Sequence, residues 1–203
     1  MEDKIYTADN LPDDFNVSSD KPTEFSPIDP SEIYTIQVLK ADTRDNKWYK
    51  PEEKDLSKRG EKYQFNFEFA ILDDGDFYGR RLWKSTGTYF KPEGKKGPTI
   101  LYKIITCAIK KLMTWEECYT FNLDSKTFVE NIQSNVVGKQ LKVAIENITK
   151  NGKTYSKITT FNMVKKELPP FDQEKSKQKG EELKLRKLQE KSTENVEPED
   201  VPF

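Results

Sequence analysis

Histidine is missing from this chain of 203 residues, and cysteine occurs only as Cys107 and Cys118. A zinc knuckle or another Cys/His metal cluster therefore does not fit the composition, and we expect no metal and no other cofactor. Histidine is also the usual general base in nucleophilic catalysis, so its absence argues against an enzyme of that kind. We expect a protein that is not an enzyme and whose cysteines are free, buried thiols in a reducing cytosol.

Long apolar runs are missing as well. No stretch of the sequence reaches the length that crosses a membrane, and the acidic sequence MEDKIYTADN at the start does not resemble a signal peptide. These absences predict a protein that does not bind membranes and works in the cytoplasm, which is the host cytoplasm if the protein is viral. Only 34% of the residues are hydrophobic and 34% are charged, so we expect disordered ends around one domain.

The formal net charge of −1 conceals a division of the chain into three parts. Residues 1–31 carry a net charge of −6, residues 32–166 carry +8 and residues 167–203 carry −3. A basic middle between acidic ends is typical of a domain that binds a polyanion. We predict an acidic, largely disordered segment over 1–30, a folded domain over 31–166 and a charged, flexible tail over 167–203.

The stretch from Lys62 to Phe90 predicts a β-hairpin. Aromatic residues alternate with polar ones along its first strand, which puts the rings on one face, and we expect that face to fill the core: Tyr63, Phe65, Phe67 and Phe69. The cluster Asp73-Asp74-Gly75-Asp76 predicts the turn. The return strand, from Phe77 to Lys84, mixes aromatic rings with cations, a combination that suits stacking on bases and contact with phosphates.

The return strand supplies the first predicted nucleic-acid-binding residues, which are Tyr78, Arg80, Arg81, Trp83 and Lys84. If Leu82 points into the core, Arg81 and Trp83 point outward together, and the pair combines stacking with phosphate contact. The alternative is that Trp83 belongs to the core.

A long polar loop from Ala41 to Glu61 carries a second group, Lys47, Trp48 and Tyr49. A loop of this length in a compact domain is usually functional, so we predict that these residues contact nucleic acid. The alternative is a mobile insertion whose Trp48 packs back onto the body of the domain.

A closing hairpin carries the third group, Lys153, Tyr155 and Lys157, and Lys142 lies on the polar face of the strand before it. These residues either contact nucleic acid or form a solvated edge of the sheet. The turn of this hairpin is predicted at Asn151-Gly152, a type I′ signal.

Apolar periodicity predicts the remaining elements. The first is a strand over Ile33–Leu39, and a helix follows from Thr99 to about Met113. A second helix start of capping-box form is predicted at Thr114, and another helix from Ser125 to Ile132. A marginal helix from Glu174 to Lys191 has an apolar stripe that is too narrow to pack firmly. Three strands, a helical region and a closing hairpin predict a mainly β fold. We expect a five-stranded, OB-fold-like barrel with a helical insertion between strands 3 and 4.

Two parts of the chain resemble known single-stranded DNA-binding proteins. The sequences ILDDGDFYGRRLW and VVGKQLKVAIENITKNGKTYSKITTF are similar to a phage-encoded family, in which a hydrophobic–Gly–Arg/Lys strand precedes a helix and a Val-Gly-Lys…Asn-Gly-Lys…Tyr-x-Lys hairpin. This likeness covers roughly residues 32–166. The sequence Glu199-Asp200-Val201-Pro202-Phe203 resembles the acidic tip of bacterial single-stranded DNA-binding proteins, although Val201 replaces an isoleucine and the acidic residues are fewer.

The resemblance implies an OB-fold protein that coats and protects single-stranded DNA in replication and recombination, largely without sequence preference. Whether RNA binds as well is left open by the sequence. The resemblance also implies that Asp200, Val201, Pro202 and Phe203 bind replication or recombination proteins.

Two other functions are compatible with the sequence. One is an adaptor in replication or recombination, in which the tails recruit proteins and DNA binding is minor. The other is a metal-dependent nuclease that uses Asp73, Asp74 and Asp76, although a turn explains these aspartates more simply.

Overall fold

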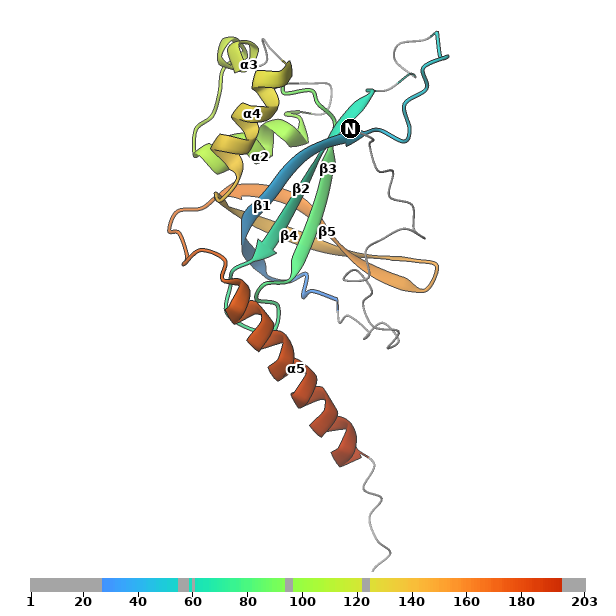
Figure 1. Cartoon of the computed structure of the whole chain (residues 1–203), viewed down its shortest axis with the longest axis vertical. Coiled ribbons are helices and arrows are strands. Elements are labelled where there is room, and N and C mark those ends of the chain that lie inside the picture. The colour runs from blue at the N-terminus through green and yellow to red at the C-terminus, as the bar shows by residue number, and fades with distance from the viewer. Residues whose placement is uncertain (1–26, 55–58, 60, 94–96, 122–124, 195–203) are drawn as a thin grey trace, which may run out of the picture.

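The computed structural model describes residues 27–54, 59, 61–93, 97–121 and 125–194 (Figure 1). Its strands are β1 (Ile33–Asp45), β2 (Tyr63–Ile71), β3 (Arg81–Thr86), β4 (Gln140–Lys150) and β5 (Lys153–Met163). Its helices include α2 (Ile100–Ile109), α3 (Trp115–Phe121), α4 (Ser125–Val136) and α5 (Gln173–Glu194). The predicted mainly β class is confirmed, and so is the helical region between the third and fourth strands.

The strands form one antiparallel sheet of five in the order β3-β2-β1-β4-β5. β1 lies in the centre and pairs with β4 through Ile33–Gln37 and with β2 from Ile36 to Asp45. A register shift between Val38 and Lys40 interrupts the β1–β2 ladder. The two ladders thus share only Ile36 and Gln37 of one long strand, which curves through the middle of the sheet (Figure 1).

The sheet does not close into the predicted barrel, because it keeps two edges. Across the residues that the structure describes, no backbone ladder joins β3 to β5. β3 has only 6 residues, all of them paired with β2, so the edge that it offers to β5 is short. The edges still approach each other, since the Lys84 ammonium donates a hydrogen bond to the Ile158 carbonyl at 3.0 Å.

The aromatic strand β2 fills the core, as the alternation predicts. Phe65, Phe67 and Phe69 are at most 1% exposed, and their rings stack along the strand with centroids 6.1 Å apart. Burial of each ring contributes about 1.5–3 kcal/mol to the stability of the fold. Tyr63 is the exception to the predicted set: it begins the strand and is 47% exposed.

Helix α2 begins at the predicted cap and ends earlier than predicted. The Thr99 hydroxyl accepts a hydrogen bond from the Tyr102 amide, which satisfies one of the free N–H groups of the first turn. Lys110 adopts a left-handed conformation with φ of 57°, which ends the helix before Met113. The buried side of α2 includes Ile104, Ile105 and Ala108, in agreement with the predicted apolar face.

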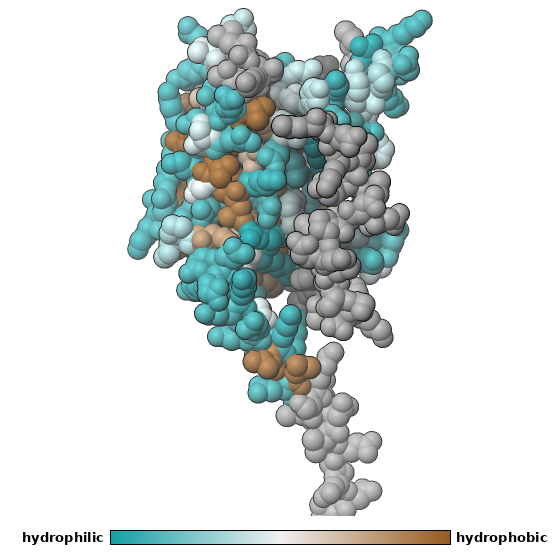
Figure 2. Space-filling model, in the orientation of Figure 1, coloured by the Kyte–Doolittle hydropathy of each residue, from teal (hydrophilic) through white to brown (hydrophobic). Residues whose placement is uncertain are grey.

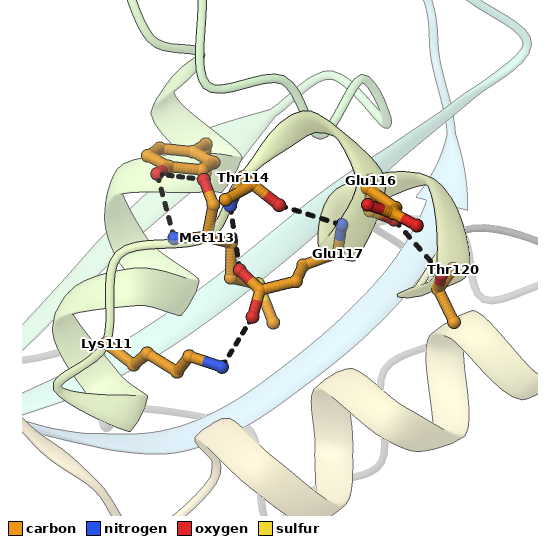
Figure 3. Close-up of polar contacts among 7 residues, drawn as sticks. Lys111, Met113, Thr114, Glu116, Glu117 and Thr120 are labelled. Carbon is orange, nitrogen blue, oxygen red and sulfur yellow. Dashed lines mark hydrogen bonds and ion pairs between the residues drawn. The ribbon is translucent and has the colours of Figure 1, made fainter.

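The predicted capping box opens α3 (Figure 3). The Thr114 hydroxyl accepts from the Glu117 amide at 3.2 Å, and the Glu117 carboxylate accepts from the Thr114 amide at 2.8 Å. Lys111 pairs with the same carboxylate at 2.6 Å, and this network holds the pKa of Glu117 below its usual range. Both thiols, one on α2 and one on α3, are free and buried as predicted, and burial raises the pKa of Cys107 and of Cys118.

The return strand of the hairpin starts later than predicted, because Phe77–Arg80 forms a turn. The Gly79 amide donates to the Ile71 carbonyl at 2.8 Å, and the Arg80 amide donates to the Phe77 carbonyl at 3.0 Å. Gly79 has φ of +76°, a conformation that favours glycine. The aromatic residues of this turn have high strand propensity, which misled the prediction from sequence.

Residues on both sides of the predicted 31–166 domain contact its sheet. Before it, Ile28 is fully buried, and its carbonyl accepts a hydrogen bond from the Asn147 amide at 2.8 Å. After it, the buried Gln140 side chain bonds both backbone groups of Leu168, at 2.6 and 2.9 Å. The folded unit therefore extends past residue 166, into the segment Leu168–Ser176 that we call the strap.

Helix α5 continues from the strap and extends away from the body of the protein (Figure 1). Two ion pairs fix it to the β2–β3 turn: Lys175 to Asp74 at 2.7 Å and Arg186 to Asp76 at 2.5 Å. Leu185 and Leu188 are 62% and 64% exposed and form an apolar spot far along the helix (Figure 2). The marginal helix is therefore docked at its start by polar contacts, not by an apolar stripe.

Gly79 provides a test of the docking of α5. A Cβ atom at Gly79 would lie 2.0 Å from the Ser176 Oγ, whereas at Gly138, with a similar φ of +83°, it would meet nothing within 4 Å. We expect Gly79→Ala to lower the free energy of unfolding by about 1–3 kcal/mol more than Gly138→Ala, because only the first adds a clash to the backbone strain.

Urea denaturation of both variants measures this difference. Adding Ser176→Gly to the Gly79 variant should restore part of the loss by removing the clashing side chain. Equal losses for the two alanine variants would show that α5 does not lie against this turn.

Candidate nucleic-acid interface

The side chains of strand β3 point inward and outward as the sequence predicts. Leu82 is 4% exposed and points into the core, while Trp83 is 62% exposed on the outward face. This confirms the phase argument and excludes a core position for Trp83. The residue opposite Trp83 on β2 is Glu68, which forms an ion pair with Arg81 at 3.5 Å. An indole ring, a cation and a carboxylate thus share this part of the outward face.

The strap covers Arg81 and Tyr78. The Phe171 ring lies 4.5 Å from the Arg81 guanidinium carbon and stacks on Tyr78 with centroids 6.4 Å apart and planes at 23°. Tyr78 is 8% exposed, and its hydroxyl accepts from the Asp172 amide at 3.1 Å. The ring pair contributes about 0.5–1.5 kcal/mol and the cation–π contact about 0.5–1 kcal/mol. These two predicted binding residues are therefore present at the site but lie under a protein side chain.

Arg81 keeps one unused donor beneath the strap. Its Nη1 atom is buried and, among the residues that the structure describes, has no hydrogen-bond partner. The neighbouring Arg80 is half-buried, its guanidinium lies 5.7 Å from the Phe77 ring, and burial lowers its pKa.

Lys84 and Lys157 meet where the β3 and β5 edges approach. Lys84 is half-buried and bonds the Ile158 carbonyl, whereas Lys157 is exposed. Burial lowers the pKa of Lys84, and the positive charge of Lys157 lowers it further. The structure therefore brings together cations that the sequence predicted on two distant strands.

The β4–β5 hairpin carries the third predicted group. Asn151 and Gly152 have φ of 52° and 72°, in agreement with the predicted type I′ turn. Tyr155 is 55% exposed, and Lys153 is exposed beside the turn. Lys142 is exposed on β4 between Thr35 and Asn162, inside the sheet and not on its β3 edge.

The loop between β1 and β2 presents Trp48 to solvent. Its ring is 84% exposed, so the alternative in which Trp48 packs back onto the domain is wrong. The Asn46 side chain stabilises the local turn. It accepts a hydrogen bond from the Trp48 backbone amide at 3.0 Å and donates one to the Glu61 carbonyl at 2.8 Å. Lys47 is exposed and Tyr49 is half-buried beside it.

Two lysine–tyrosine pairs escaped the sequence prediction. Tyr63 and Tyr89 are 47% and 60% exposed, and the ammonium groups of Lys62 and Lys91 lie 5.0 Å from their ring centroids. Tyr63 was assigned to the core because it shares the phase of the buried rings. The adjacent residues Lys62-Tyr63 were the signal that could have identified this pair.

The aspartates of the β2–β3 turn are used by the protein itself. Asp73 accepts from the Thr35 amide, Asp74 pairs with Lys175 and Asp76 pairs with Arg186. The lysine holds the pKa of Asp74 below its usual range. The described part of the chain contains no group of three or more potential ligands that could hold a metal ion.

The predicted partner-binding residues Asp200, Val201, Pro202 and Phe203 lie outside the described residues. None of the helices in the described ranges is long and apolar enough to cross a membrane. A scan of protein-family models and a search of curated protein sequences find no match to this chain.

Lys84 allows a test of its bridging contact. We expect Lys84→Ala to lower the free energy of unfolding by about 1 kcal/mol, because a partly buried hydrogen bond between the β3 and β5 edges is lost. Lys153→Ala is the matched control and should leave stability unchanged, because that side chain is exposed beside the hairpin turn and Lys153 is not among the groups that shift the pKa of Lys84. Thermal and urea unfolding measure both, and an unchanged stability of the Lys84 variant would contradict the bridge.

Proposed function

We propose that this protein is an OB-fold protein that binds single-stranded DNA, largely without sequence preference, and coats it in replication and recombination. The observation that carries the proposal is the set of exposed aromatic rings with cations beside them on three separate elements. Trp83 is on β3, Trp48 in the β1–β2 loop and Tyr155 on β5. In Figure 1 the loop and the β4–β5 hairpin tip both project on the side of the sheet where β3 lies.

The order of strands supports the fold part of the proposal. An OB-fold is a five-stranded, partly open Greek-key barrel whose loops after the first and fourth strands flank the binding face. The sheet order β3-β2-β1-β4-β5 brings β3 and β5 to the two edges, and the Lys84 contact links them. Trp48 lies in the loop after the first strand, and Tyr155 lies on β5 shortly after the turn that follows the fourth strand.

The chemistry suits a flexible polyanion with stacked bases. Stacking of a base on an aromatic side chain contributes about 1–3 kcal/mol and tolerates any sequence. The exposed ammonium groups of Lys47, Lys153 and Lys157 are available to neutralise phosphates at either side of the rings. Bases stack on such rings only when they are unpaired, so this surface favours single strands.

We further propose that Asp200–Phe203 recruit replication or recombination proteins. The support for this is the sequence likeness to the acidic tip of bacterial single-stranded DNA-binding proteins. In that arrangement the domain holds DNA and the tip holds the partner.

Tryptophan substitutions test the DNA-binding proposal. We expect Trp83→Ala to weaken binding of oligo-dT about fivefold or more, since one stacking contact is lost. The matched control is Trp115→Ala, which removes a 50% exposed ring on α3, outside the proposed face, and should leave affinity unchanged. Fluorescence anisotropy of labelled oligo-dT measures all variants.

Equal affinities of the wild type and the Trp83 variant would contradict the proposed face. No binding of oligo-dT by the wild type would favour the adaptor instead. Cleavage of the oligonucleotide in magnesium, lost on Asp74→Asn, would favour the nuclease.

A further inference from the structure

The strap places one aromatic side chain on a surface that has the parts of a nucleotide site. Phe171 stacks on the Tyr78 ring and lies against the Arg81 guanidinium. Its own amide donates to the Gln37 side-chain oxygen at 2.6 Å. The ring therefore lies between an aromatic face and a cation, which are groups that proteins use to hold a base and its phosphate.

Arg81 points to a ligand that the strap does not supply. Its buried Nη1 makes no hydrogen bond within the described residues, although the Glu68 carboxylate forms an ion pair with this atom at 3.5 Å. A phenyl ring offers no lone pair, so Phe171 leaves this donor unsatisfied. A phosphate oxygen or the edge of a base would satisfy it, because both accept from a guanidinium.

We propose that the surface beneath Phe171, formed by Tyr78 and Arg81, is a subsite for one nucleotide of single-stranded DNA, and that the Phe171 ring occupies it in the absence of DNA. This proposal rests on the proposed function. It adds the position of one nucleotide on the sheet and a gate, the Phe171 ring, which blocks that position when DNA is absent. A base stacks on Tyr78 when the phenyl ring swings out, and Arg81 bonds the nucleotide through Nη1. The subsite extends the face of Trp83 along β3, because Arg81 and Trp83 point outward from the same strand.

In this proposal the Phe171 side chain moves, while the backbone of the strap and Lys175, whose ammonium lies 4.5 Å from the Tyr78 ring centroid, stay in place. The backbone of the strap is anchored by Gln140 on Leu168 and by Gln37 on Phe171, and α5 is held by its ion pairs with Asp74 and Asp76. Phe171 itself is half-buried and is not a member of the hydrophobic core cluster of the described residues. A base that replaces the ring forms contacts of the same kinds, so the exchange is close to balanced.

The test removes the gate and keeps the strap. Phe171→Ala should bind short oligo-dT about fivefold more tightly than the wild type, because the nucleotide no longer competes with a stacked ring. Leu185→Ala is the matched control, since it removes an exposed apolar side chain on α5, the helix that follows the strap, and should leave the affinity unchanged. Adding Arg81→Gln to the Phe171 variant should cancel the gain.

A second measurement uses the wild type and does not depend on how the variants fold. In nuclear magnetic resonance spectra the contact between the Phe171 and Tyr78 rings should disappear when oligo-dT saturates the protein. A persistent contact, together with an unchanged or weaker affinity of Phe171→Ala, would overturn the subsite while the binding of DNA at Trp83 still stood. If neither the wild type nor the Phe171 variant binds oligo-dT, both the subsite and the proposed function are wrong.

Discussion

The pairing of one long central strand with two neighbours determines the rest of this structure. β1 pairs with β4 through Ile33–Gln37 and with β2 through Ile36–Asp45. The register shift between Val38 and Lys40 lies just after Gln37, where the pairing with β4 ends. The connection after α4 is fixed at the same point, because the Val38 amide and carbonyl bond Lys139 and Gly138 at 2.9 and 2.8 Å. The order of the strands, and with it the identity of the edges, follows from this arrangement.

Several of the proposed DNA-binding residues lie on the two edge strands of the sheet. β3 and β5 each pair with a single neighbour in the sheet, so one backbone edge of each strand has no partner strand among the described residues. Trp83 and Tyr155 are exposed there, while Phe65 and Phe67 at the centre are buried. The same alternation that fills the core therefore also presents aromatic rings to solvent, and the proposed DNA-binding face is a direct product of the folding pattern.

The sequence predicted what depends on local pattern and missed what depends on distant contacts. The bounds of β2, the cap at Thr99 and the box at Thr114 follow from periodicity and capping, which neighbouring residues determine. Two contacts at the site could not be predicted from the sequence. The contact of Phe171 with Arg81 joins residues 90 positions apart, and Phe171 belongs to a segment whose composition is mostly polar. The hydrogen bond from Lys84 to the Ile158 carbonyl joins two strands that do not pair, so no local sequence pattern predicts it.

The central claim is that this sheet binds single-stranded DNA through stacking and a few phosphate contacts, and a salt titration of oligo-dT binding tests it most directly. The account predicts strong quenching of tryptophan fluorescence at low salt. The logarithm of the affinity should fall with the logarithm of salt concentration with a slope of about −2, which corresponds to roughly three neutralised phosphates, one for each of Lys47, Lys153 and Lys157. An absence of quenching at low salt, or an affinity that does not change with salt, would contradict it.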